Sequence, residues 1–94
     1  MLAEGDRTPP TALPGKILVV DDEQRILRFV VRGLQAEGFA VDWADNGADG
    51  LRKALDGGYD LVILDLLMPG MDGVSVLGRL VTRRPVAVFC WLTW

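Results

Sequence analysis

The chain has 94 residues, of which 50% are hydrophobic and 24% charged, and this balance indicates one globular domain rather than a disordered chain. The formal net charge of −3 without a basic stripe argues against direct nucleic-acid binding, and the lack of histidine excludes histidine catalysis and histidine metal ligands. One cysteine allows no intrachain disulfide, and the sequence shows neither a signal peptide nor an apolar run of the roughly 18–20 residues that span a bilayer, so we expect a soluble cytoplasmic protein without membrane contact.

The first half of the chain predicts an alternation of strands and helices. Residues 1–15 are rich in proline, threonine and glycine, and we expect them to form a flexible tail. The apolar run at residues 16–21 predicts a strand that is buried on both faces. Apolar residues at helical spacing across residues 23–37, with arginines opposite them, predict an amphipathic helix. Gly38 suits the left-handed cap that ends such a helix.

The same alternation continues through the middle of the chain. Residues 39–44 predict a second short strand. Asn46 and Asp49 resemble an N-cap pair that opens a helix ending at the double glycine of residues 57–58. Residues 61–65 then predict a third strand.

The last part of the chain predicts one more helix and one more strand. Residues 73–82 have helical periodicity, and residues 86–93 form an apolar run that is typical of a buried strand. The predicted inward-facing residues of this helix are Val74, Leu77, Leu80 and Val81.

Strands that alternate with helices through short connections predict a parallel α/β sheet with helices on both faces. Ligands of such sheets bind outside the carboxyl ends of the strands, where the strand order reverses. The acidic residues of the first and third predicted strands lie at that edge. If these two strands are neighbours, as in the order 2-1-3-4, their ends flank the reversal point.

Three carboxylates therefore form the candidate site: Asp21 and Asp22 after the first strand, and Asp65 at the end of the third. Carboxylates that lie close together repel one another unless a cation is bound among them. Mg²⁺ suits this set because it prefers oxygen ligands and keeps several of its waters. We expect Asp22, Asp65 and the main-chain carbonyl of Leu67 to be direct ligands, with Asp21 acting through water or by orienting the site.

A structural interpretation competes with this one for each acid taken singly. An aspartate at a strand end is often only a helix cap or a turn residue, and Asp72 is best explained as the cap of the third helix. A doubled aspartate together with a second strand-end aspartate favours a metal-dependent phosphoryl or hydrolytic site instead. A phosphatase of related topology would need another acid close after the nucleophile, and Leu66 and Leu67 occupy those positions.

Two motifs, VVDDE at residues 19–23 and DLLMPGMDG at residues 65–73, resemble the receiver domain of bacterial response regulators. The resemblance covers about residues 16–80 and implies a flavodoxin-like, doubly wound parallel sheet in the order 2-1-3-4-5. It implies that Asp65 is the phosphoacceptor, charged from a phosphohistidine on a sensor histidine kinase or a phosphotransfer protein, and that Asp21 and Asp22 belong to an acidic Mg²⁺ pocket. It further implies a signalling module of a two-component system rather than an enzyme. The wording of the second motif is most similar to receivers that are joined to DNA-binding, transcription-regulating domains.

The sequence departs from the family after the fourth predicted strand. We expect an incomplete receiver domain at residues 16–94 that is truncated before the fifth strand, through a premature stop or a shifted reading frame. No lysine matches the family's phosphate-binding lysine, because Lys16 begins the first strand and Lys53 lies on the second helix. The family's switch hydroxyl has two candidates, Thr93 by its spacing from Asp65, or Cys90 in its place by its spacing from Pro85.

This departure leaves two functional hypotheses open. The first is a phosphoacceptor receiver that works with Mg²⁺ and transfers phosphate poorly without the lysine. The alternative is a truncated or degenerate receiver with little or no phosphotransfer, which acts only by binding a kinase or a relative. In either case the apolar fourth strand at the sheet edge predicts self-association.

Overall fold

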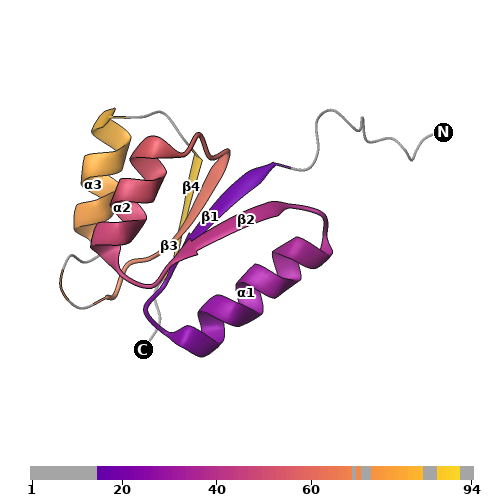
Figure 1. The fold of residues 1–94 in the computed structure, drawn as a ribbon. Helices are drawn as coiled ribbons and strands as arrows, with labels where there is room; N and C mark the ends of the chain where they lie inside the picture. The colour runs from indigo at the N-terminus through magenta and orange to yellow at the C-terminus, as the bar shows by residue number, and fades with distance from the viewer. Residues whose placement is uncertain (1–14, 69, 71–72, 84–86, 92–94) are drawn as a thin grey trace.

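The computed structural model describes residues 15–68, 70, 73–83 and 87–91 (Figure 1). Most of the predicted tail, the predicted helix cap Asp72 and the switch candidate Thr93 lie outside the described residues. The elements are β1 (Lys16–Val20), α1 (Gln24–Ala36), β2 (Ala40–Ala44), α2 (Gly47–Asp56), β3 (Leu61–Asp65), α3 (Gly73–Arg83) and β4 (Ala87–Trp91). Each predicted element is present, with boundaries that differ by a few residues at most.

The four strands form one parallel sheet in the order β2-β1-β3-β4, which confirms the predicted flavodoxin-like order. The pairing of β1 with β3 places Ile17 opposite Leu61 and Val20 opposite Leu64. The two strands therefore end level with each other. This register carries Asp21, the residue after β1, to the same edge as Asp65, the last residue of β3.

Helices cover both faces of the sheet, with α1 alone on one face and α2 beside α3 on the other (Figure 1). Alternate residues of β1 supply the two hydrophobic cores, as expected for a strand buried on both faces. Leu18 and Val20 belong to the core under α2 and α3, which we call the α2–α3 core. Ile17 and Val19 pack with Leu27 in the core under α1.

Local sequence signals set the helix ends as predicted. The Glu23 side chain accepts a hydrogen bond from the Arg25 N–H and caps α1, and the Asn46 side chain does the same for the Asp49 N–H at α2. Gly38 has φ +97°, the left-handed conformation that glycine adopts without steric cost. Gly15, which the tail prediction included, directly precedes β1, and its carbonyl accepts a hydrogen bond from the Ala40 N–H at 3.1 Å.

The predicted inward face of α3 is partly wrong. Leu80 is fully buried and Leu77 packs against the α2–α3 core, but Val74 and Val81 are 62% and 56% exposed. Val76 is buried in their place. The helix is rotated because its first residue, Gly73, lies directly against the end of β3, where a side chain would not fit. None of the helices within the described residues is long and apolar enough to cross a membrane.

Candidate metal centre

The three predicted carboxylates converge at the carboxyl edge of the sheet. One carboxylate oxygen each from Asp21, Asp22 and Asp65 lies within 4.8 Å of the other two. Asp21 and Asp65 are fully buried, whereas Asp22 is exposed. The site therefore has two carboxylates in the protein interior and one that faces solvent. A small ion or phosphoryl group can approach the cluster from the solvent side, where Asp22 lies.

Main-chain N–H groups two residues further along the chain hold both buried carboxylates. The Glu23 N–H donates to Asp21 Oδ1 and the Leu67 N–H donates to Asp65 Oδ1, each at 2.9 Å. These bonds are local because both aspartates are followed by a turn out of the strand. They orient the two carboxylates relative to each other.

The second oxygen of Asp21 is the clearest sign that the cluster suits a cation. Asp21 Oδ2 is buried and accepts no hydrogen bond from any residue that the structure describes. The pKa of Asp21 is raised to about 6, mainly by burial and further by the neighbouring carboxyl groups of Asp65 and Asp22, although the hydrogen bond from the Glu23 N–H acts in the opposite direction. A buried acceptor without a partner is costly, so its presence favours a ligand that supplies positive charge.

The donor set fits a hard divalent cation. Every side chain of the cluster offers carboxylate oxygen, which Mg²⁺ and Ca²⁺ prefer over the nitrogen and sulfur ligands of zinc sites. Three carboxylate oxygens would leave the remaining octahedral positions of Mg²⁺ for waters and for a phosphoryl oxygen. The residues of the cluster therefore fit Mg²⁺.

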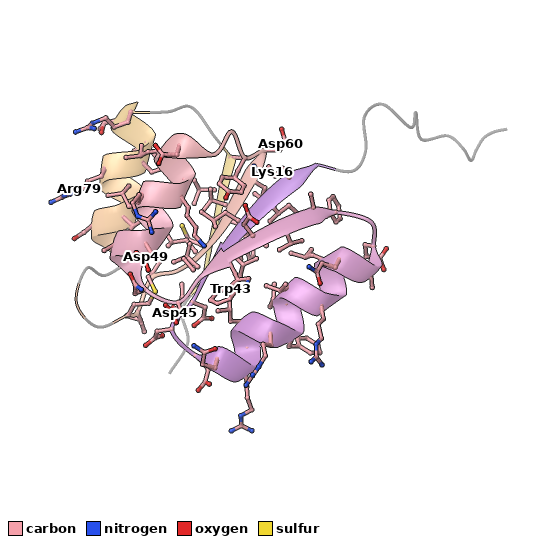
Figure 2. All side chains as sticks on the ribbon, in the orientation of Figure 1. Lys16, Trp43, Asp45, Asp49, Asp60 and Arg79 are labelled. Carbon is pink, nitrogen blue, oxygen red and sulfur yellow. The ribbon has the colours of Figure 1, made fainter. Side chains whose placement is uncertain are left out.

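Contacts that the sequence did not reveal connect the site to β2. The Asp21 N–H donates to the Ala44 carbonyl at 3.2 Å, and the Gln24 amide donates to Asp45 Oδ2 at 3.3 Å. Figure 2 shows Asp45 and Asp49 together beside the beginning of α2. No sequence signal predicts the bonds from Asp21 to Ala44 and from Gln24 to Asp45, because both bonds depend on the pairing of β1 with β2.

Neither lysine of the described residues lies at the acidic cluster. The Lys16 ammonium donates to the Gly57 carbonyl at 3.0 Å and lies 4.8 Å from the centroid of the Tyr59 ring, at the opposite end of β1 (Figure 2). The Lys53 ammonium donates to the Trp43 carbonyl at 2.6 Å and lies over the Trp43 ring. The absence of a counterpart to the family's phosphate-binding lysine stays a prediction.

The remaining predicted site residues are placed as follows. The Leu67 main chain lies next to Asp65 through its N–H, and the role of its carbonyl as a ligand stays a prediction. Cys90 lies opposite Leu64 on β4 and packs against the α2–α3 core, where burial raises the pKa of its thiol. Its role as a substitute for the switch hydroxyl also stays a prediction.

Comparisons with known proteins agree with this geometry. The model of the response regulator receiver domain matches residues 17–93. The transcriptional regulatory protein ResD of Bacillus subtilis is 44% identical over 73 residues, which are 78% of this chain and 30% of ResD. The chain spans about a third of the length of the curated relatives it matches.

Solved structures show the same fold. The response regulator TrrA of Thermotoga maritima, in complex with Mg²⁺ and beryllofluoride, matches with a TM-score of 0.81 and 39% identity over 86% of this chain and 71% of TrrA. The complex of TrrA with the histidine kinase ThkA matches with a TM-score of 0.76 and 41% identity, over 82% of this chain and 67% of the matched chain. The converging acids, the strand order and the family match lead to one conclusion: this chain belongs to the response regulator receiver domain family.

Proposed function

We propose that the domain accepts a phosphoryl group on Asp65 in a two-component phosphorelay. In this proposal Asp22, Asp65 and the Leu67 carbonyl hold Mg²⁺, and Asp21 acts through water or by orienting the site. The donor is a phosphohistidine of a sensor histidine kinase or a phosphotransfer protein in the cytoplasm. The observation that carries the proposal is the cluster of two buried carboxylates and one exposed carboxylate within 4.8 Å, in which Asp21 Oδ2 has no partner among the described residues.

The proposed step is an in-line transfer to a carboxylate. An oxygen of Asp65 attacks phosphorus, the new P–O bond forms as the P–N bond of the phosphohistidine breaks, and the electron pair of that bond returns to the imidazole. The product is an acyl phosphate. Mg²⁺, when bound, supplies the positive charge that the phosphoryl oxygens require.

The chain itself contributes orientation and a specific electrostatic environment. The Leu67 N–H holds one oxygen of Asp65 and so limits the rotation of the attacking carboxylate. The burial of Asp65 removes the water that would otherwise solvate it. Asp22 lies on the solvent-exposed side of the carboxylate cluster, where the phosphohistidine donor would approach.

Two properties of relatives support the proposal. TrrA binds Mg²⁺ together with beryllofluoride, and TrrA forms a complex with the histidine kinase ThkA. ResD is named a transcriptional regulatory protein. We therefore propose that the signal received on Asp65 serves transcription regulation.

The alternative function is a binding module with little or no phosphotransfer. The observation that favours it is the position of Lys16 and Lys53, whose ammonium groups are both engaged away from the acids. Without a lysine beside the phosphoryl group, Mg²⁺ is the one proposed source of positive charge there. A phosphorylation assay separates the two functions.

The test is incubation of the 94-residue chain with acetyl phosphate and Mg²⁺, followed by intact-mass measurement. We expect an adduct of about 80 Da, the mass of one phosphoryl group, that requires Mg²⁺ and is absent in Asp65→Asn. Asp56→Asn is the matched control, because Asp56 is an exposed aspartate at the C-terminal end of α2. A folded chain that acquires no adduct under these conditions rejects phosphotransfer and supports the binding module.

A further inference from the structure

Gly73, the buried first residue of α3, is in direct contact with the main chain of the candidate site. A Cβ atom at this position would overlap the main-chain oxygen of Asp65 and the Cα atom of Leu66. It would also lie 2.9 Å from the carbonyl carbon of Asp65. All three neighbours are backbone atoms, so no side-chain rotation can relieve the overlap.

The helix cannot easily move away from this contact. Val76 and Leu80 anchor α3 in the α2–α3 core, where both side chains are fully buried. Withdrawal of α3 would expose these side chains or leave a cavity beneath them, and either change is unfavourable. Leu66 and Leu67 follow the end of β3 in a turn at the sheet edge and have fewer such constraints, because Leu66 is only partly buried and Leu67 is exposed. A side chain at residue 73 is therefore expected to displace the turn rather than the helix.

We infer that Gly73 is a positioning residue that sets the location of the Asp65 carboxylate and the Leu67 main chain relative to Asp21 and Asp22. The Leu67 N–H to Asp65 Oδ1 bond, 2.9 Å long, is the part of the turn that a displacement would break first. The consequence for metal binding rests on the proposed function, whereas the consequence for this bond does not.

Two other substitutions separate positioning from stability. A Cβ atom on Gly78, in the same helix, would meet no atom within 4 Å, so Gly78→Ala tests the effect of an added methyl group on α3. Leu80→Val removes core contact near the other end of α3, far along the helix from Gly73. The first leaves the site and the core unchanged, and the second lowers stability without touching the turn.

The experiment measures backbone amide hydrogen exchange by NMR on the metal-free 94-residue chain and its variants, followed by a Mg²⁺ titration monitored by amide chemical shifts. We expect Gly73→Ala to accelerate exchange of the Leu67 amide at least about 10-fold relative to the amides of β3, and to raise the Kd for Mg²⁺ by a similar factor. Gly78→Ala should change neither quantity. Leu80→Val should accelerate the Leu67 and β3 amides together and leave the Kd within about twofold of the unsubstituted value.

Each other outcome has a definite meaning. If Leu67 exchange in Gly73→Ala follows that of β3, Gly73 is only a packing residue and the inference is wrong. A Gly73→Ala variant that stays unfolded even in sucrose, which favours the compact state, while Leu80→Val folds, also overturns it. If the unsubstituted chain binds no Mg²⁺, the proposed function fails, and Leu67 exchange still decides the role of Gly73.

Discussion

Asp21 follows β1 and Asp65 ends the neighbouring parallel strand β3, and both side chains are fully buried. One carboxylate oxygen of each lies within 4.8 Å of the other and of one from Asp22. Two like charges at this separation in the protein interior destabilise the metal-free fold. The same repulsion is relieved when a cation binds. The arrangement that makes the site suitable for Mg²⁺ therefore also makes the stability of the domain depend on pH and on metal.

The metal-free stability is predicted to fall as pH rises from about 4 to about 6. The pKa of Asp21 is about 6 in the folded protein, whereas in the unfolded chain it is near the ordinary aspartate value of 3.8. Between these values the folded state holds the proton more tightly, so a rise in pH favours unfolding until both states are ionised. Because a tenfold difference in proton affinity corresponds to about 1.4 kcal/mol, the expected loss of stability is a few kcal/mol at most.

Urea unfolding of the metal-free chain and of Asp21→Asn across this pH range checks the prediction. The asparagine variant lacks the titrating group, so its advantage in unfolding free energy should grow between pH 4 and 6 and stay constant above that range. Using the difference removes the contribution of acids that do not interact with Asp21, such as Asp49, whose pKa is lowered by its hydrogen bonds with Asn46 and Arg52. An advantage that does not change with pH would show that Asp21 titrates normally.

Neutralising Asp22 is predicted to weaken Mg²⁺ binding without loss of stability. Asp22 is exposed, so Asp22→Asn removes a ligand charge but no buried contact. We expect the Kd for Mg²⁺ to rise by about 10-fold or more, which is about 1.4 kcal/mol. Isothermal titration calorimetry measures the Kd, and Asp56→Asn, with an exposed acid outside the cluster, should bind as the unsubstituted chain does. Equal affinity of both variants would remove Asp22 from the ligand set.

Tyr59 is predicted to stabilise the fold at a distance from the site. Its hydroxyl donates to Asp42 Oδ2 at 2.6 Å, and the ring is 8% exposed beneath the Lys16 ammonium. Burial raises the pKa of Tyr59 to about 12, and its hydrogen bond with Asp42 acts in the same direction. Tyr59→Phe should lower the free energy of unfolding by about 1–2 kcal/mol, since it removes a hydrogen bond to a charged acceptor.

Thermal or urea unfolding gives this difference, and a Mg²⁺ titration of the same variant supplies the control. The affinity should not change because Tyr59 packs with Lys16 at the edge opposite the acids. A variant that loses metal binding together with stability would mean that the two edges of the sheet are coupled.

Self-association through β4 is predicted for the 94-residue chain. In the described sheet β4 pairs with β3 and with no other strand, its residues carry no charge, and Phe89 is 58% exposed. An apolar strand with one open edge is a template for pairing with another chain. Sedimentation at increasing concentration should show a rising average mass, and Phe89→Lys should reduce it.

Phe29→Lys is the matched control for this prediction. Phe29 is 78% exposed but lies on α1, away from the strand edge. The Phe29→Lys variant should therefore associate like the unsubstituted chain. If Phe29→Lys abolishes association and Phe89→Lys does not, the contact surface is α1 rather than β4.

Much of the fold follows from patterns within short stretches of the chain. Val and Ile runs that end in aspartate predicted β1 and β3, and the Asn46 and Asp49 pair predicted the beginning of α2. These signals are local because strand propensity, helix periodicity and capping each act over a few residues. The predicted inward face of α3 was partly wrong because Val74 and Val76 both fit a helical stripe. The contact of Gly73 with β3 selects Val76 as the buried residue.

The sequence by itself determined the order of elements, the family resemblance and the identity of the three acids, because each of these depends on residues close together in the chain. Only the tertiary structure decided that Asp21 and Asp65 are fully buried, that their carboxylates converge with Asp22 within 4.8 Å, and that Lys16 is engaged at the opposite edge. Burial and convergence depend on the pairing of strands more than 40 residues apart, such as Ile17 with Leu61, and on the packing of helices over them. No local pattern specifies those distances, because they result from the pairing of all the strands and from the packing of the helices on both faces of the sheet.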